Sequence, residues 1–151
     1  MGSRAVFTTV VALGVVASLA AQSRPDFSGT WTAMPSADAA AGEAPPLLVI
    51  TQSATELVVT RTTARGKETF TYRLDGVETV ETNMLGDTKL VAAWQDDTLV
   101  VTRTRTLTAP SGPVADTATE SYTMDAGSLV VSSGRKMPNG ETRTQRWRYA
   151  K

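Results

Sequence analysis

Alternation of apolar and polar residues is the feature that most constrains how this chain can fold. Between Glu68 and Leu74 the three apolar positions, Phe70, Tyr72 and Leu74, are spaced two apart. Successive side chains of a strand point to opposite faces, so this spacing predicts a strand with one buried face. Comparable segments, rich in threonine and valine, recur as far as Ala150, and no long stretch has the apolar spacing of an amphipathic helix. The sequence therefore predicts an all-β protein.

Short polar turns separate the expected strands. These strands cover residues 29–34, 47–52, 56–63, 68–74, 77–83, 89–95, 98–107, 117–124, 129–135 and 141–150. Connections this short allow only antiparallel pairing between neighbours, and Asp75-Gly76 is the strongest hairpin signal because a type I′ turn needs positive φ. Since closure removes the exposed edges of a large sheet, we predict an up-and-down antiparallel meander that closes into a barrel of about 8–10 strands. A two-sheet β-sandwich is the alternative.

A Leu-Val-Val unit recurs at 57–59, 99–101 and 129–131. Alternation places its leucine and its second valine on the inner face of the sheet each time. Barrel closure further requires that the last strand, which carries Trp147, pairs with the first strand, which carries Trp31. The enclosed interior depends on this pairing.

Residues 1–21 have the layout of a secretory signal peptide. Arg4 supplies a positive charge, an apolar run follows, and small residues suited to cleavage end at Ala21. The apolar run is short for a membrane span, so an N-terminal anchor helix is only the alternative. We expect a protein exported to the periplasm or the extracellular space, with a single domain over residues 22–151 and no stable membrane anchor after cleavage.

Charge and residue types narrow the functional classes. The chain has 15 basic and 15 acidic residues, and loss of Arg4 with the leader leaves a formal charge of −1. A near-neutral domain lacks the basic surface that nucleic acids require, so we expect no such partner. Histidine and cysteine are both absent, which removes the commonest general base and the thiol nucleophile. We expect no catalytic residues, no metal, no cofactor and no enzyme; Asp96-Asp97 is read as a solvated turn.

The segment from Pro25 to Trp31 reads Pro-Asp-Phe-Ser-Gly-Thr-Trp. Its Gly-x-Trp end resembles the signature of lipocalins and related calycin-type barrels, in which the tryptophan closes one end and an arginine near the last strand packs across it. The resemblance implies these closing roles for Trp31 and for Arg146 or Arg148. The longer segment is also similar to a group of small exported bacterial proteins that mostly have no assigned function.

Aromatic residues are few, and two interpretations of them remain open. All of them can belong to the core, since aromatic side chains dominate ordinary core burial. Alternatively, Tyr72, Trp94 and Tyr122 line a cavity that is open at one end. A barrel of this size either holds one small ligand or fills with side chains.

Arg61, Arg103 and Arg105 fall on the predicted inner face if alternation is strict. Three arginines near a barrel mouth favour an anionic ligand such as a carboxylate. A bulge after each Val-Val pair would instead turn them to solvent. There they would pair with Glu68, Glu78 or Glu120. The cost of burying an unpaired arginine favours solvent or rim exposure.

We therefore predict an exported, non-enzymatic barrel that binds a small amphipathic or anionic molecule at its mouth. The expected ligand contacts are Tyr72, Trp94, Arg103, Arg105 and Tyr122. The alternative is an extracytoplasmic interaction or structural module with a side-chain-filled barrel, which meets an unknown protein partner through a strand edge or the Pro35–Pro46 loop. As a loop, that segment is long enough to act as a lid.

Overall fold

A computed structural model describes residues 24–35, 45–83, 86–109, 112–136 and 140–151 of this protein. This part of the chain forms ten strands. Their bounds are β1 Gly29–Ala33, β2 Leu47–Gln52, β3 Glu56–Thr63, β4 Gly66–Arg73, β5 Thr79–Asn83, β6 Gly86–Gln95, β7 Thr98–Ala109, β8 Gly112–Asp125, β9 Ser128–Lys136 and β10 Thr142–Ala150. The predicted signal peptide and most of the Pro35–Pro46 loop lie outside the described residues.

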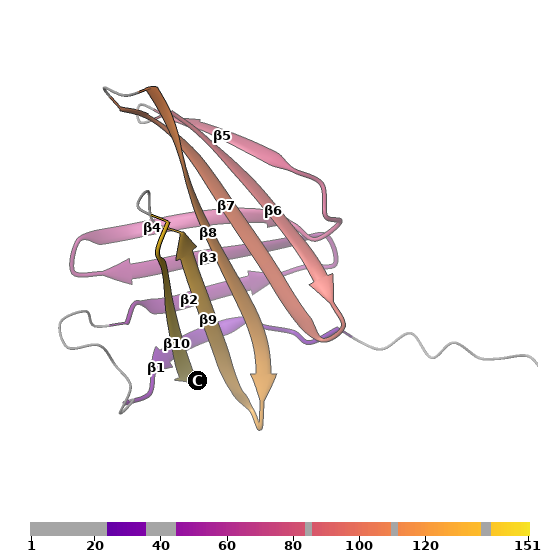
Figure 1. Cartoon of the computed structure of the whole chain (residues 1–151). Coiled ribbons are helices and arrows are strands. Elements are labelled where there is room, and N and C mark those ends of the chain that lie inside the picture. Colours follow the sequence, from indigo (N-terminus) through magenta and orange to yellow (C-terminus); the bar gives the residue numbers. More distant parts are fainter. Residues whose placement is uncertain (1–23, 36–44, 84–85, 110–111, 137–139) are drawn as a thin grey trace, which may run out of the picture.

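The described strands form one antiparallel sheet in the order β4-β3-β2-β1-β10-β9-β8-β7-β6-β5. Figure 1 shows β1 to β4 crossing behind β6 to β10, so that the sheet wraps around an interior. The predicted all-β meander is confirmed, and the sandwich alternative is wrong because the described strands belong to a single continuous sheet. No helix in the described ranges has the length and apolar character that a membrane span requires.

The two ends of the chain are paired, as the closure argument requires. Thr32 of β1 lies opposite Ala150 of β10, and Ala33 lies opposite Tyr149. The backbone N–H of Met34 extends this pairing with a 2.7 Å hydrogen bond to the carbonyl of Arg148. The head and tail strands therefore form the middle of the sheet, and the sheet's free edges belong to β4 and β5.

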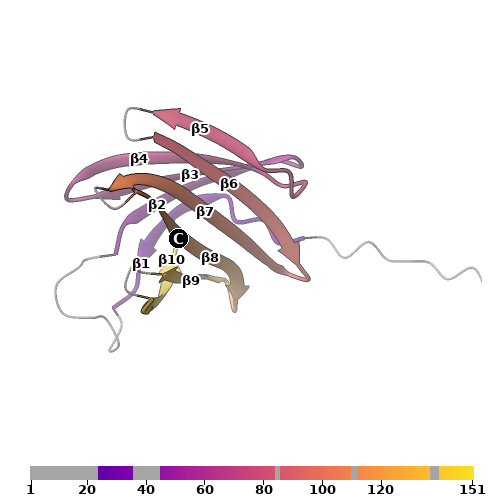
Figure 2. The same cartoon turned by 45° about the horizontal axis from the view of Figure 1, so that its top comes forward.

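The predicted hairpin at Asp75-Gly76 is wrong, because β4 and β5 stand at opposite ends of the strand order. A local turn does form: Gly76 has φ +78° and the Asp75 carboxylate accepts a 3.0 Å hydrogen bond from the Val77 N–H. The backbone N–H of Leu74, however, donates to the carbonyl of Thr55, which keeps the end of β4 on the β3 side. Figure 2 shows β4 and β5 near each other at the seam of a nearly closed barrel, where β4 contacts β6.

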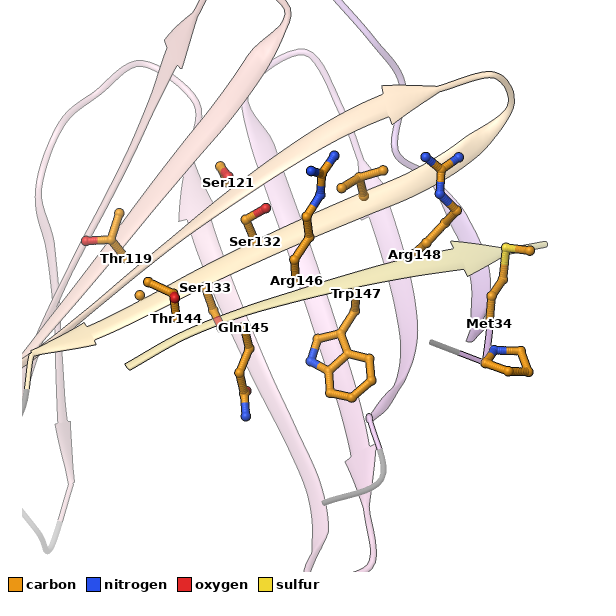
Figure 3. Close-up of a pocket in the computed structure, with 13 residues that line it drawn as sticks. Met34, Thr119, Ser121, Ser132, Ser133, Thr144, Gln145, Arg146, Trp147 and Arg148 are labelled. Atoms are coloured by element: carbon orange, nitrogen blue, oxygen red, sulfur yellow. The ribbon is translucent and has the colours of Figure 1, made fainter. Parts of the chain in front are cut away.

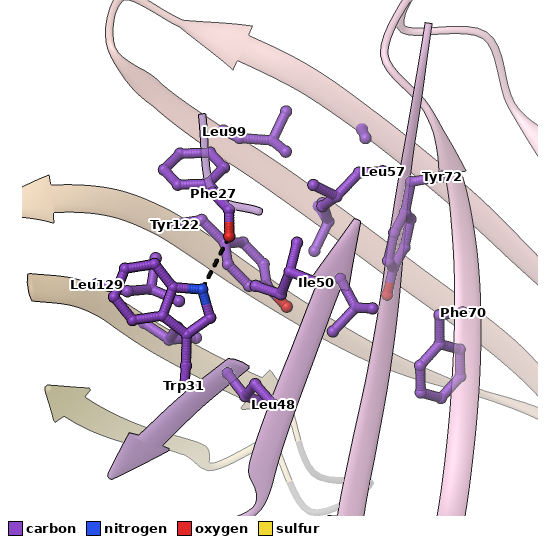
Figure 4. Packing of buried hydrophobic residues seen from close by; sticks show 14 of the residues in the cluster. Phe27, Trp31, Leu48, Ile50, Leu57, Phe70, Tyr72, Leu99, Tyr122 and Leu129 are labelled. Atoms are coloured by element: carbon purple, nitrogen blue, oxygen red, sulfur yellow. Dashed lines mark hydrogen bonds between the residues drawn. The ribbon is translucent and has the colours of Figure 1, made fainter. Parts of the chain in front are cut away.

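Apolar side chains from the inner faces of nine strands and the N-terminal segment fill much of the barrel (Figure 4). The buried positions include both residues predicted from each Leu-Val-Val unit and the three apolar positions at residues 70, 72 and 74. The inner-face predictions are therefore confirmed. The core consists of Phe27, Trp31, Leu48, Ile50, Leu57, Val59, Phe70, Tyr72, Leu74, Leu90, Ala92, Leu99, Val101, Tyr122, Leu129, Val131 and Tyr149.

The segment before β1 is fastened to one end of the barrel by Gln52. The Gln52 side chain accepts a 3.0 Å hydrogen bond from the Phe27 N–H and donates one of 2.9 Å to the carbonyl of Pro25. The indole N–H of Trp31 donates to the carbonyl of Phe27 at 2.8 Å, the bond drawn in Figure 4. Phe27 and Trp31 are fully buried as a result, and this end of the barrel is closed by side chains.

Candidate functional site

A buried ion pair joins two distant strands across the barrel interior. Arg61 on β3 donates one hydrogen bond to Glu120 on β8 at 2.8 Å, and its second terminal nitrogen binds the other carboxylate oxygen. The side chain of Glu120 is 6 % exposed and that of Arg61 is 15 % exposed. A guanidinium and a carboxylate paired in this two-pronged way are a strong, directional contact.

Tyr122 completes this pair from the same strand as Glu120. Its hydroxyl accepts a hydrogen bond from Arg61 and donates one to Glu120, each 2.9 Å long. Glu120 and Tyr122 both face inward because they are two residues apart on β8. The phenol therefore bridges the cation and the anion.

Arg103 on β7 adds a second cation to the group. It approaches Glu120 at 3.3 Å, and its guanidinium lies 4.6 Å from the centre of the Phe70 ring. Three buried polar atoms beside this pair have no hydrogen-bond partner within the described part of the chain: the Nε atoms of Arg61 and Arg103, and the Tyr72 hydroxyl. Arg61, Arg103, Glu120, Tyr122 and Tyr72 are called the polar group below. It contains hydrogen-bond donors without a partner as well as donors that have one.

The protonation states follow from this arrangement. Burial disfavours ionised Glu120, but its hydrogen bond to Arg61 and the charges of Arg61 and Arg103 outweigh burial and lower the pKa of the carboxyl. Burial also opposes the charge on Arg61, yet Tyr122 and Glu120 raise the pKa of its guanidinium. Burial raises the pKa of Tyr72 to about 12 and that of Tyr122 well above its ordinary value. Near neutral pH Arg61 is therefore a guanidinium ion and Glu120 a carboxylate, whereas Tyr72 and Tyr122 are neutral phenols.

The inward position of Arg61 and Arg103 corrects the favoured expectation that these arginines turn to solvent. Both residues continue the strict alternation of β3 and β7 with no bulge before them. Pairing removes the cost of burial that argued against this arrangement. The expectation that Glu120 pairs with arginine in solvent is corrected as well: Glu120 lies two residues from the inward-facing Tyr122 on β8, and this spacing is the sequence signal for its inner-face position.

The other expected ligand contacts separate into two regions. Tyr72, Arg103 and Tyr122 come together in the polar group, and Arg105 occupies the next inward position along β7, where its Nε donates to Thr88 at 3.4 Å. Trp94 lies at the opposite end of the barrel, stacked on Phe27 with ring centres 5.7 Å apart. Trp94 therefore packs with Phe27 and under the guanidinium of Arg24, which is 5.2 Å from the centre of its ring, and not with the arginines of the polar group.

Trp31 is fully buried, and the cation over its ring is Lys151. The Lys151 amino group lies 5.0 Å from the centre of the Trp31 ring. Arg148 is exposed and paired with Asp125, and Arg146 is exposed as well. This corrects the expectation for the two arginines: in the β10 alternation they fall on the outer face, opposite Tyr149.

A groove of about 940 Å³ lies on β8, β9 and β10. Figure 3 shows Arg146 and Arg148 pointing to one side of β10, and Gln145 and Trp147 pointing to the other. Its lining residues are Met34, Pro35, Thr119, Ser121, Val130, Ser132, Ser133, Gly134, Thr144, Gln145, Arg146, Trp147 and Arg148. None of the expected ligand contacts lines this groove, so it is separate from the polar group inside the barrel.

The chemistry of the interior group is that of charge recognition. In the described ranges no cluster of three or more His, Cys, Asp or Glu side chains could hold a metal ion. Asp96 and Asp97 are exposed in the β6–β7 turn, where Asp96 adopts φ +53°. What the interior offers is hydrogen-bond donors and an excess of guanidinium groups over carboxylates, beside the Phe70 ring.

Comparisons with solved structures find the same architecture in proteins of very different sequence. Human cRBP IV aligns with a TM-score of 0.58 at 13 % identity, over 85 % of this chain and 99 % of that protein. A protein described as REP1-NXSQ fatty acid transporter aligns with a TM-score of 0.50 at 12 % identity, over 70 % of this chain and 69 % of that one. The fold they share with this chain is an antiparallel β-barrel, which here is a single meander sheet that nearly closes.

At these identities the likeness establishes the fold alone. No family model matches the sequence. A search of curated proteins also finds no match. Of the two neighbours named above, one is described as a fatty acid transporter. Any ligand of this barrel must therefore be argued from its own interior residues.

Proposed function

We propose that this protein is an exported, non-enzymatic barrel that binds a small amphipathic anion, with a carboxylate head and an apolar tail, at the mouth of the barrel. The observation that carries the proposal is the excess of buried cations: Arg61 and Arg103 share one carboxylate, that of Glu120. A ligand carboxylate would balance the remaining charge in a place where water screens it poorly.

Arg103 is the natural point of attachment. Its contact with Glu120 is long, at 3.3 Å, and its Nε has no partner within the described residues. The Tyr72 hydroxyl is a second donor without a partner in this region. Unsatisfied buried donors are costly, and a ligand oxygen that accepts from both residues would relieve that cost.

The surroundings of Arg103 suit an apolar tail. Its guanidinium lies against the Phe70 ring, and its partner across the β6–β7 ladder is the buried Leu90. Side chains fill the other end of the barrel around Phe27 and Trp31. These features favour a short or medium tail that enters from the arginine end.

The likeness to a structure described as a fatty acid transporter supports this ligand class at the level of the fold. Calorimetric titration with decanoate tests it directly, with decanol as the matched uncharged compound. We expect saturable decanoate binding and much weaker decanol binding. Arg103→Gln should abolish the preference for decanoate, whereas Arg146→Gln removes the same charge from the outer face and should leave binding intact. Equal binding of both compounds, or none of either, would reject the proposal.

Export is a separate part of the proposal, supported by the layout of residues 1–21. Expression of the full chain in a Gram-negative host and fractionation of the cells tests it. We expect the protein in the periplasmic or culture fraction, with an intact mass that lacks about the first 21 residues. Full-length protein retained in the cytoplasmic fraction would contradict export without affecting the ligand proposal.

A second candidate function rests on the filled core. Seventeen buried hydrophobic side chains form one cluster among the described residues. Together with the polar group they occupy the interior, and a barrel filled in this way suits an interaction module. Outer-face residues Leu47 and Val49 are 39 % and 40 % exposed. Self-association or a copurifying partner in sedimentation experiments, combined with silence in the decanoate titration, would favour this alternative.

A further inference from the structure

Arg105 is a third inward-facing arginine, next to the polar group. It follows Arg103 by two residues on β7, which places both side chains on the same face of the strand. Thr88, the partner of Arg105 across the β6–β7 ladder, is buried and accepts a 3.4 Å hydrogen bond from the Arg105 Nε. Within the described residues the terminal nitrogens of Arg105 make no hydrogen bond and no ion pair. The guanidinium is therefore held at Nε, and its two terminal nitrogens are left for a ligand.

The carboxylates around Arg105 are bound elsewhere or lie in solvent. Asp116, which stands opposite Arg105 on β8, accepts hydrogen bonds of 2.9 and 2.7 Å from Arg135 through both of its oxygens. Glu120 receives four hydrogen bonds from within the polar group, which is about as many as an ionised carboxylate accepts. Two further carboxylates near this end are exposed, so that water screens their charge: Glu68 and Glu81.

The two arginines of β7 contact opposite neighbours of that strand. Arg103 approaches Glu120 on β8, whereas Arg105 binds Thr88 on β6. Alternate positions on a strand are about 7 Å apart along the backbone, so the two guanidinium groups offer two separate places for an anion. An anionic group beside Arg105 would lie on the β6 side, away from the carboxylate of Glu120. Repulsion by Glu120 therefore acts less on that place than on a second charge beside Arg103.

We propose that Arg105, held by Thr88, is a second anion-binding position at the barrel mouth, and that the preferred ligand carries two carboxylates on adjacent carbons beside one apolar tail. The inference rests on the proposed function and adds the number and spacing of the charges in the ligand head. One carboxylate accepts from Arg103 and the Tyr72 hydroxyl. The other accepts from both terminal nitrogens of Arg105, in the paired geometry that guanidinium and carboxylate groups favour.

The test compares 2-octylsuccinate with undecanoate, which is the same molecule without the second carboxylate. Dissociation constants are measured by calorimetry at about pH 8, where all of these carboxyl groups are ionised, and at ligand concentrations too low for micelles. The wild-type protein should bind octylsuccinate at least about tenfold more tightly than undecanoate. Arg105→Gln should bring that ratio near one, because octylsuccinate loses far more affinity than undecanoate. Arg146→Gln removes the same charge from the outer face and should leave the ratio unchanged.

The outcomes separate the inference from the proposed function. If the wild type binds undecanoate but binds octylsuccinate no more tightly, the second anion position is wrong while monocarboxylate binding stands. A wild-type ratio that persists in folded Arg105→Gln also overturns the role of Arg105. If the wild type binds neither compound, the proposed function fails and the inference fails with it. Should Arg105→Gln not fold, Arg105→Met, which keeps the apolar stem and removes the charge, gives the same comparison.

Discussion

Arg61 and Tyr122 meet across the barrel interior, where the guanidinium donates a 2.9 Å hydrogen bond to the phenolic oxygen. They are 61 residues apart in sequence, and they lie on strands from opposite sides of the interior. The hydroxyl of Tyr122 in turn donates a hydrogen bond to the carboxylate of Glu120. The polar group therefore ties β3 to β8 with bonds that solvent scarcely reaches, and its contribution to stability can be measured.

Tyr122→Phe removes only the hydroxyl from this bridge. Arg61 and Glu120 then each lose a buried partner, so we expect the free energy of unfolding in urea to fall by about 1–3 kcal/mol. Tyr149→Phe is the matched control: Tyr149 is also buried, but its hydroxyl makes no hydrogen bond to this pair within the described residues. Equal losses for the two variants would mean that the hydroxyl bridge contributes nothing.

The Arg61–Glu120 pair should show strong coupling in a double-mutant cycle. Removing one partner leaves the other charge buried and poorly compensated, at a cost of about 3–5 kcal/mol for each single variant. Arg61→Met combined with Glu120→Gln removes both charges, so the double variant should be more stable than the sum of the single losses predicts. Chemical unfolding of all four proteins gives the coupling energy. Simple additivity would contradict a direct pair.

Acid should destabilise the protein through Glu120. Arg61, Arg103 and Tyr122 hold the pKa of this carboxyl below its ordinary value of 4.5, despite burial. The ionised form therefore stabilises the fold fully above pH 4.5, and this stabilisation is lost as the pH falls through the lowered folded-state pKa. Unfolding measured from neutral to acid pH should show the difference between wild type and Glu120→Gln shrinking below that value. A difference that does not change with pH would argue against the ion pair.

Gly29 combines an unusual backbone conformation with a close contact. Its φ is +144°, and an added Cβ would lie 2.7 Å from Cε of Lys151. Gly29→Ala should cost about 1–3 kcal/mol in backbone strain and also displace Lys151 from the Trp31 ring. Gly66→Ala is the control, because Gly66 has φ +131° and a Cβ added there would meet no atom within 4 Å. Urea unfolding should show the larger loss for Gly29→Ala; equal losses would show that the Lys151 contact is unimportant.

Most of the fold could be predicted from the sequence because it follows from local rules. Alternation identified the inner face of β4 and of the three Leu-Val-Val units, and short turns dictated antiparallel neighbours. The prediction of a hairpin at Asp75-Gly76 is wrong because a dipeptide specifies a turn but does not specify which strand the next strand pairs with. After that turn Val77 is 49 % exposed while Leu74 is buried, so the two sides do not continue one ladder.

The polar group was harder to predict because its stability depends on a partner far along the chain. Burial of Arg61 is unfavourable when the residue is considered alone, and for that reason the sequence favours a position in solvent. The cost disappears when Glu120 arrives from a strand 59 residues later. Similarly, Lys151 and not Arg146 or Arg148 lies over Trp31, because the position of the last residue depends on the β1–β10 register. Pairings of this kind become visible only in the closed barrel.

The most direct test of the central claim observes the ligand head itself. Decanoate labelled with ¹³C at its carboxyl carbon is titrated with the protein and followed by NMR. We predict a distinct bound carboxylate signal with the wild type, kept with Arg146→Gln and lost with Arg103→Gln. A single free-ligand signal at every concentration of folded wild-type protein, or a bound signal that survives in Arg103→Gln, would contradict carboxylate binding at the barrel mouth.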